Sequence, residues 1–214
     1  MRPQHRALRA GILLAVVAAL AVSLHGAREV PNIAKSHPLL IDRWIDEIRL
    51  DVGLHWNWTR FACRASAQLT YVAWLAVVLA ALRRNRRDAL VLLMLTLATL
   101  VLSDLVLKPL VDRRHIDLAG QLTSGSVFPS GHAAVLGCIW LFRERSGIDR
   151  RQRGRRGETV VIAGVVLLVS LGMIYSACHF ATDVIAGLCL GIAVGDIVAL
   201  AVQLNRGGRC AAPE

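Results

Sequence analysis

The sequence predicts an all-α integral membrane protein, a bundle of six helices with an extracytoplasmic amphipathic segment. Of its 214 residues, 55% are hydrophobic, and six apolar runs approach or reach the roughly 18–20 residues that cross a bilayer as a helix. Basic residues gather in the short segments between alternate runs. The length is that of one domain, so we expect residues 1–214 to form a single membrane domain.

The predicted spans differ in length. They are Ala7–Leu24, Gln68–Leu82, Ala89–Leu107, Gly131–Phe142, Thr159–Cys178 and Ala181–Leu204. The first has the basic start and apolar centre of a signal peptide, but the residues after it lack a small-residue cleavage site, so we expect an uncleaved anchor. The fourth is short, and it spans a membrane only if its helix begins near Pro129 and continues toward Arg145.

The basic residues predict the orientation. With the N-terminus in the cytoplasm, sixteen of the 25 basic residues fall in cytoplasmic segments: Arg2, Arg6, Arg9, Arg83, Arg84, Arg86, Arg87, Arg143, Arg145, Arg150, Arg151, Arg153, Arg155, Arg156, Arg206 and Arg209. The positive-inside rule therefore predicts a multi-pass plasma (inner) membrane protein with both termini cytoplasmic. The basic runs are then topology signals that touch anionic membrane lipids, and nucleic acid is not an expected partner.

The segment from about residue 27 to 66 is predicted to lie outside the cytoplasm. Apolar residues recur there at helical spacing: Ile41, Trp44, Ile45, Ile48 and Val52. Acidic residues, including Asp42 and Asp46, occupy the other faces. We expect either an amphipathic helix on the membrane surface or a small helix packed on the bundle.

Two acids lie within predicted spans, where ionisable residues are functional candidates. Asp104 precedes Lys108 by four residues, so the two can pair on a continuous helix. Asp196 is expected to face the bundle interior, and the sequence identifies no partner for it.

Small residues and cysteines give further expectations. Gly187, Gly191 and Gly195 are spaced by four, which favours close packing between helices of this chain. The five cysteines show no metal-ligand spacing. Cys63 and Cys178 both fall on the outer side, where a disulfide is possible.

The predicted topology gathers polar residues at the outer ends of the spans: Lys108, Arg113, Arg114, His115, Ser130, Gly131, His132, His179 and Asp183. Lysine and arginine bind phosphoryl oxygens, and the backbone N–H groups after a Ser-Gly turn at a helix start form an anion site. Two histidines can act as nucleophile and general acid. A carboxylate one helical turn after a histidine can orient its ring. Together these are the parts for phosphoryl transfer through a phosphohistidine.

Three stretches carry a family resemblance: KPLVDRRHI, FPSGH and YSACHFATDVIAG. They resemble the motifs of the type 2 phosphatidic acid phosphatase family of membrane lipid phosphatases, over a core of about residues 90–204. The resemblance implies a lipid phosphate substrate and no metal or other cofactor. It further implies phosphate binding by Lys108, Arg113, Ser130 and the Gly131 backbone, with His132 protonating the leaving alkoxide, His179 as the nucleophile and Asp183 orienting it.

The chain departs from the family pattern at two places. His115-Ile116 stand where the family usually has Arg-Pro, and Gly172-Met173 stand where it has Ser-Arg. Loss of one charge-assisted contact to a transition state commonly costs about 2.7–4 kcal/mol, roughly a hundred- to a thousand-fold in rate. Arg114 or His115 could compensate by binding the phosphoryl group.

Alternatives therefore remain open. The chain could be a catalytically impaired family member that binds a lipid phosphate or a partner protein. A haem or metal protein using His132 and His179 is disfavoured by the cationic residues nearby. For an enzyme, the substrate could be a polyprenyl phosphate or diphosphate, phosphatidic acid, phosphatidylglycerol phosphate or a glycosylated polyprenyl phosphate.

Overall fold

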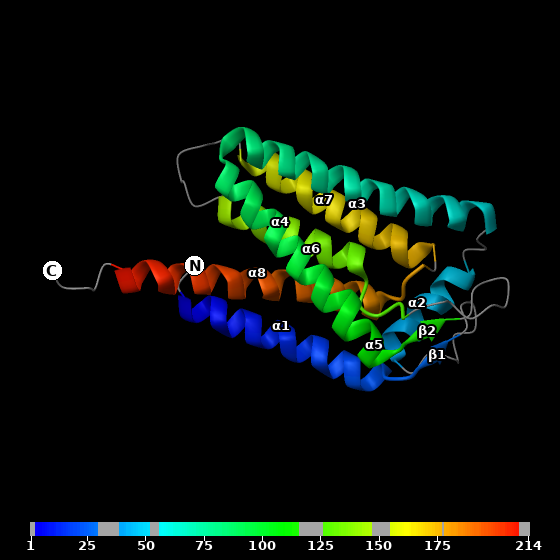
Figure 1. Ribbon diagram of the computed structural model, residues 1–214. Coiled ribbons are helices and arrows are strands. Elements are labelled where there is room, and N and C mark those ends of the chain that lie inside the picture. Colours follow the sequence, from blue (N-terminus) through cyan, green and yellow to red (C-terminus); the bar gives the residue numbers. More distant parts are fainter. Residues whose placement is uncertain are drawn as a thin grey trace.

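Long helices dominate the computed structural model, which describes residues 3–29, 39–51, 56–115, 126–146, 155–176 and 178–209. They are α1 (Pro3–Leu24), α3 (Trp56–Arg84), α4 (Arg86–Val101), α6 (Gly131–Ser146), α7 (Arg155–Tyr175) and α8 (Ala181–Arg209), packed side by side (Figure 1). The helical prediction is confirmed. A short parallel pair departs from it: β1 (Arg28–Glu29) binds β2 (Arg114–His115).

Within the described residues, four helical segments are long and apolar enough to cross a membrane: Pro3–Leu24, Phe61–Arg84, Arg86–Val111 and Ala181–Ala201. The apolar parts of α6 and α7, Gly131–Phe142 and Thr159–Tyr175, are shorter. The fourth predicted helix begins at Gly131, two residues after Pro129, and continues to Ser146, as expected. A count of six spans therefore stays a prediction.

The third predicted span is not a uniform α-helix. Asn85 caps the start of α4, where its side chain accepts a hydrogen bond of 2.9 Å from the backbone of Arg87. The helix then widens into a π-helical segment, η2 (Leu102–Leu107), and continues as α5 (Lys108–Val111). Asp112 ends it with a left-handed φ of 46°. π-helical turns are frequent at functional sites, and this one lies directly before Lys108.

The centre of the bundle is the contact between α6 and α8. A side chain at Gly187 would meet the Cβ of Ala133 at 2.9 Å, and one at Gly191 would collide with the backbone carbonyl of Ala134. The glycine stripe therefore allows the two helix backbones to approach closely. This confirms the predicted packing between helices of the same chain.

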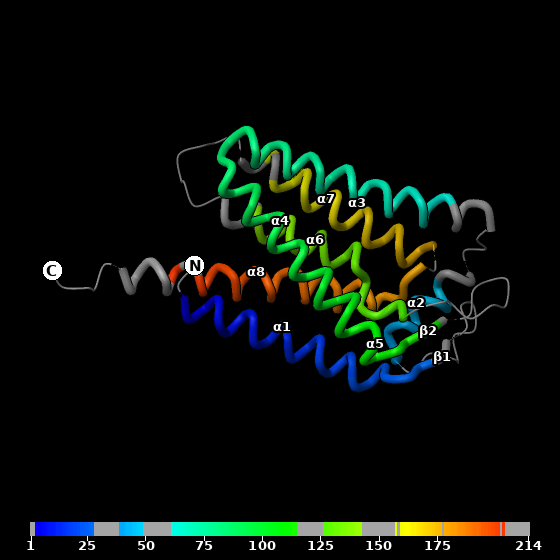
Figure 2. The backbone as a smooth tube through the Cα atoms, in the orientation of Figure 1, coloured from blue at the N-terminus to red at the C-terminus, as the bar shows by residue number. Residues whose placement is uncertain are grey.

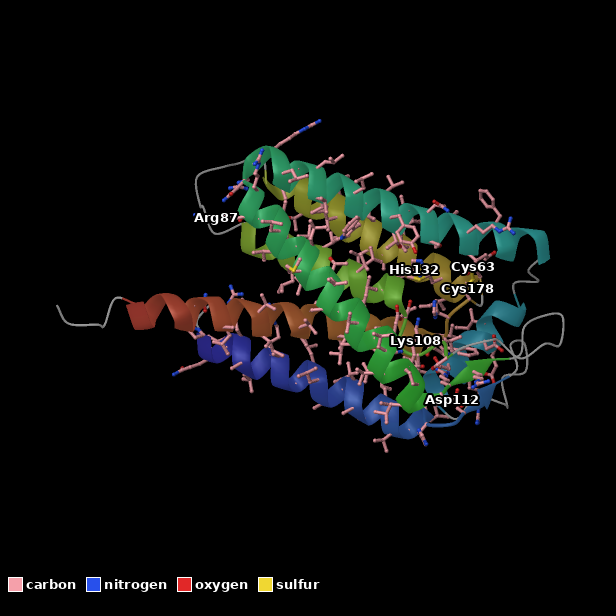
Figure 3. The ribbon with its side chains drawn as sticks, viewed as in Figure 1. Cys63, Arg87, Lys108, Asp112, His132 and Cys178 are labelled. Atoms are coloured by element: carbon pink, nitrogen blue, oxygen red, sulfur yellow. A yellow bond between two sulfur atoms is a disulfide. The ribbon has the colours of Figure 1, made fainter. Side chains whose placement is uncertain are left out.

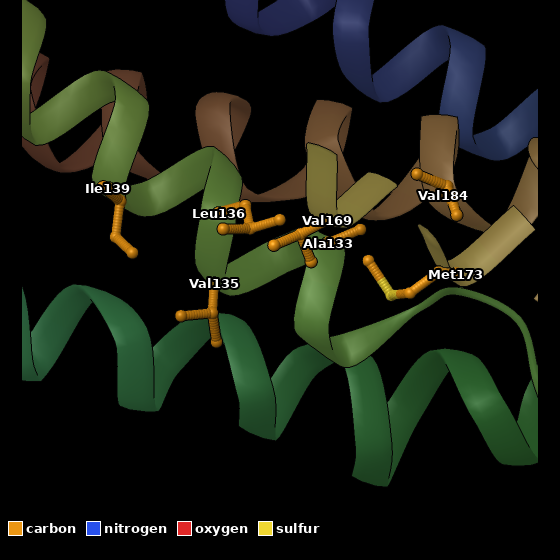
Figure 4. Packing of buried hydrophobic residues seen from close by; sticks show 7 residues of the cluster. All are labelled: Ala133, Val135, Leu136, Ile139, Val169, Met173 and Val184. Atoms are coloured by element: carbon orange, nitrogen blue, oxygen red, sulfur yellow. The ribbon is translucent and has the colours of Figure 1, made fainter. Parts of the chain in front are cut away.

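A hydrophobic cluster joins α6, α7 and α8 (Figure 4). Its buried members are Ala133, Val135, Leu136, Ile139, Val169, Met173 and Val184. Met173 is only 2% exposed. The position where the resemblance implies an arginine is therefore part of the apolar core.

The amphipathic segment does form a helix, α2 (Leu40–Asp51), which contacts α8. Its polar face turns inward, so that Asp42 and Asp46 are buried. Its apolar face is left outside, with Trp44 63% and Ile48 46% exposed. The predicted packing on the bundle is confirmed, and contact of the outer face with the membrane surface stays a prediction.

The end opposite β1 and β2 carries the N-terminus and the end of α8 (Figure 2). The structure supplies the partner of Asp196 near this end. Arg9 donates to both of its carboxylate oxygens, from Nε at 2.6 Å and from Nη2 at 2.9 Å, and Nη1 of Arg6 lies 3.7 Å away. These ion pairs fix α1 against α8. Arg87 also lies at this end (Figure 3), as the orientation prediction requires of a cytoplasmic loop.

Candidate active site

Polar residues from three parts of the chain converge at the end of the bundle that holds α2 and the strands. His132, in the first turn of α6, interacts electrostatically with His179, Lys108 and Asp104. Figure 3 shows Lys108, His132 and the Cys63–Cys178 disulfide at this end. The ring of Tyr71 on α3 packs edge-on against His132, with ring centroids 5.4 Å apart. The structure thus brings the two predicted catalytic histidines and the lysine to one place.

Lys108 is the cationic side chain that interacts with His132. Its Nζ lies 2.7 Å from Oδ1 of Asp104, which confirms the predicted pair. The two side chains are 30% and 45% exposed. The described part of the chain therefore does not enclose Lys108, and phosphate binding by this residue stays a prediction.

The nucleophile candidate His179 lies in the turn between α7 and α8, where its backbone N–H donates to the carbonyl of Met173 at 3.4 Å. Nδ1 of its ring faces Oδ2 of Asp183 at 3.9 Å, as the four-residue spacing predicts. This is longer than a hydrogen bond, and Nδ1 has no hydrogen-bond partner within the described part of the chain. Catalytic hydrogen bonds are often long before substrate binds. The contact leaves Nε2 as the ring nitrogen for attack.

Arg113 is buried within the site, and phosphate binding by it stays a prediction. Its side chain is 0% exposed and lies behind Asp183 rather than at an open phosphate site. Nη1 donates to Oδ1 of Asp183 and, at 2.7 Å, to the hydroxyl of Thr182; Nη2 donates to Asp42 at 2.9 Å. The guanidinium also lies over the ring of Phe180, 4.5 Å from its centroid. Arg113 therefore holds the carboxylate behind the nucleophile.

Ser130 is also turned inward. Its side chain is buried, with its hydroxyl 3.7 Å from the sulfur of Met173, and it accepts a 3.4 Å hydrogen bond from the backbone N–H of Ala133. Its own N–H donates to the carbonyl of Asp183 at 3.0 Å. Ser130 thus connects the start of α6 to the start of α8. Phosphate binding by Ser130 and the Gly131 backbone stays a prediction.

Arg114 and His115 were the two residues proposed to compensate for Met173. Nε of Arg114 lies 2.7 Å from Oδ1 of Asp112, so its guanidinium is paired with a neighbouring carboxylate. His115 belongs to β2, and its side chain lies outside the described residues. Phosphate binding by either residue stays a prediction.

Packing explains the glycine at position 172, where the family usually has a serine. A side chain at this position would collide with Oγ of Ser66 on α3. The glycine therefore allows α3 to lie directly against α7. Three residues before Ser66 on α3, Cys63 forms a disulfide with Cys178, with a Cα–Cα distance of 6.1 Å. The possible pairing is thus present, and it fixes the residue directly before His179.

Asp42, Thr182 and Tyr71 are contacts of the site that the sequence did not identify. Asp42 is visible in the sequence as a polar position on an amphipathic helix, but periodicity does not show whether that face meets water or protein. Thr182 lies inside the third motif, between the nucleophile and its acid. Among the described residues, no group of three or more acids, histidines and cysteines could hold a metal ion.

Comparison with known proteins agrees with this geometry. Residues 106–206 match the family model of the PAP2 superfamily. The chain is 30% identical over 109 residues to phosphatidylglycerophosphatase B of Bacillus subtilis (strain 168); the match covers 47% of this chain and 52%, about half, of that relative. A crystal structure of a transmembrane PAP2-type phosphatidylglycerolphosphate phosphatase from Bacillus subtilis aligns with a TM-score of 0.65 at 20% identity, covering 92% of this chain and 96% of that one, which shows a shared fold. The segment that matches the PAP2 superfamily model, residues 106–206, contains every predicted site residue.

Proposed function

We propose that this protein is a membrane lipid phosphatase that hydrolyses a lipid phosphate or diphosphate through a phosphohistidine intermediate. The observation that carries the proposal is the convergence of His132, His179 and Lys108 at one end of the bundle, with Asp183 behind His179. A nucleophile, an acid and a cation are the minimum needed for this chemistry. The match of residues 106–206 to the PAP2 superfamily model supports the same reaction.

In the proposed reaction, the phosphoryl group binds beside Lys108 and the first turn of α6. Nε2 of His179 forms a bond to phosphorus while the bond from phosphorus to the lipid oxygen breaks. His132 gives its proton to that leaving oxygen. Water then attacks phosphorus, His132 accepts a proton from it, and inorganic phosphate leaves as His179 is regenerated. Asp183 stabilises the positive charge that the ring carries after attack.

We propose that the site faces the extracytoplasmic side. The basic residues near the termini and at Arg87 lie at the opposite end of the bundle, and the positive-inside rule assigns such residues to the cytoplasm. The disulfide beside His179 supports this orientation, because disulfides persist mainly in oxidising compartments. Phosphatidylglycerophosphate is the first substrate to test, since the curated relative is a phosphatidylglycerophosphatase; polyprenyl phosphates and phosphatidic acid follow.

The test is release of inorganic phosphate by the purified protein from this panel of lipids. His179→Ala should lower turnover at least about a thousand-fold, as loss of a catalytic nucleophile does. His5→Ala is the matched control, because His5 is exposed on α1 and far from the site, and it should retain full turnover. In the wild type, acid-labile, alkali-stable phosphate bound to protein should accumulate after rapid quenching. Unchanged hydrolysis by the His179 variant would exclude the mechanism.

A second candidate function follows from Met173. A neutral thioether beside Ser130, where the family arginine is expected, weakens the phosphate site. The protein would then bind a lipid phosphate without hydrolysing it. Saturable binding of phosphatidylglycerophosphate, with no phosphate released from any lipid of the panel, would favour this function over the first.

A further inference from the structure

The buried carboxylate of Asp42 belongs to no part of the proposed reaction, and it lies outside the region that matches the PAP2 superfamily. It comes from the first turn of α2 and inserts between two residues of the site. Oδ1 accepts a 3.1 Å hydrogen bond from the backbone N–H of Thr182. Oδ2 accepts hydrogen bonds from the Thr182 hydroxyl and, at 2.9 Å, from Nη2 of Arg113.

We propose that Asp42 is a positioning residue for the nucleophile: through Arg113 and Thr182 it holds Asp183 behind His179. The proposal rests on the proposed phosphatase function. It gives α2, which the family motifs do not include, a role in catalysis. Asp42 itself contacts neither the substrate nor His179.

The first part of the argument is geometric. Asp183 is the third residue of α8, and its Oδ2 accepts from the backbone N–H of Phe180 at 2.9 Å, directly before the helix. Asp42 binds the N–H of Thr182, a second donor that a helix start leaves without an intrahelical partner. Two carboxylates, one from α8 and one from α2, thus fix the turn that carries both His179 and Asp183. Acidic groups are also favoured there by the helix dipole.

The second part is electrostatic. The side chains of Asp42, Arg113 and Asp183 are all 0% exposed. With all three ionised, the group carries a net charge of −1, which complements the positive ring that His179 becomes when it attacks phosphorus. Without the charge of Asp42, the net charge of Arg113 and Asp183 together would be zero. Such interactions are strong where water is excluded, so Asp42 stabilises the transition state without touching it.

The test is Asp42→Asn in the full-length protein, assayed with whichever lipid phosphate the wild type hydrolyses. The substitution removes the charge at almost constant volume. We expect kcat to fall between about ten- and a hundred-fold, the range expected when a catalytic group is misplaced by a distant change, while KM stays within a factor of two. Asp42→Glu, which restores the charge, should recover part of kcat.

Asp196→Asn is the matched control. It breaks another buried aspartate–arginine pair, with Arg9, at a position about 20 Å further along α8 from Asp183. We expect it to lower Tm without lowering kcat. Thr182→Val is a second variant that keeps α2 intact; combined with Asp42→Asn it should reduce kcat by less than the product of the single effects, because both act through one contact.

Three results would overturn the inference: wild-type kcat in folded Asp42→Asn, a rise in KM with kcat unchanged, or an equal loss of kcat in Asp196→Asn. If Asp42→Asn does not fold, wild-type kcat in Thr182→Val would overturn it as well. Absence of hydrolysis in the wild type would instead contradict the proposed phosphatase function. The two failures are therefore distinguishable.

Discussion

Replacing Arg113 tests which of two roles this basic residue has: binding of phosphate or stabilisation of the fold. If a basic residue only binds phosphate, replacing it weakens substrate binding and leaves the fold intact. If it bridges two buried carboxylates, replacing it destabilises the fold. Arg113 is 0% exposed and binds Asp42 and Asp183. Arg113→Ala would leave both carboxylates buried without this cation, and removal of one partner of a buried pair costs about 3–5 kcal/mol.

The assay is thermal unfolding of the purified protein in detergent. For a chain of this size, about 1 kcal/mol shifts Tm by roughly 2–4 °C, so Arg113→Ala should lower Tm by roughly 6–20 °C. Arg114→Ala is the control, because Arg114 forms a half-exposed pair with Asp112, and such pairs are worth about 0–1 kcal/mol. An unchanged Tm in Arg113→Ala, with a raised KM, would refute the structural role and support direct phosphate binding.

Two further predictions concern the scaffold around the site. Cys63→Ser opens a link between residues 115 apart, which the chain-entropy relation values at about 5 kcal/mol; a reductant should therefore lower the Tm of the wild type but not that of the variant, and Cys189→Ser, at a free cysteine, should leave Tm unchanged. Gly191→Ala places a methyl group against the backbone of α6 and should destabilise the protein by about 1–3 kcal/mol. Gly164→Ala, where nothing lies within 4 Å, should be neutral or slightly stabilising; equal Tm values for these two glycine variants would contradict the close α6–α8 contact.

The positions of helices could be predicted because hydropathy and charge are read directly along the chain. Asp104 and Lys108 are four residues apart in one continuous helical segment, and they pair as expected. The π-helical η2 between α4 and α5 was not predicted, since its hydropathy is that of an ordinary span. The burial of Asp42 was not predicted for a similar reason: helical periodicity separates polar from apolar faces, but it does not say which face meets the protein.

The ion-pair partners of charged residues were harder to predict than whether those residues are buried. Asp196 was expected inside the bundle, and it is buried, yet Arg9 is 187 residues away along the sequence. Arg113 follows Lys108 closely, and both were assigned to the phosphate. Asp112, which lies between them, has a left-handed backbone conformation; Arg113 is buried beyond it, whereas Lys108 is partly exposed. Spacing along the sequence does not show such a difference in burial.

The altered third motif and the inward position of Arg113 have a common consequence for the site. Met173 contributes an apolar surface beside Ser130, and Gly172 allows α3 to pack against α7. The two cations near His179 therefore have different neighbours. Arg113 compensates the carboxylates behind His179, while Lys108 interacts with His132. If Arg113 were moved forward to bind phosphate, Asp42 and Asp183 would lie together uncompensated, and two buried carboxylates would repel the phosphate as well as each other. Under the proposed function, the buried bridge is thus itself a condition for binding an anion next to Asp183, and it leaves Lys108 as the cation proposed to bind the phosphate.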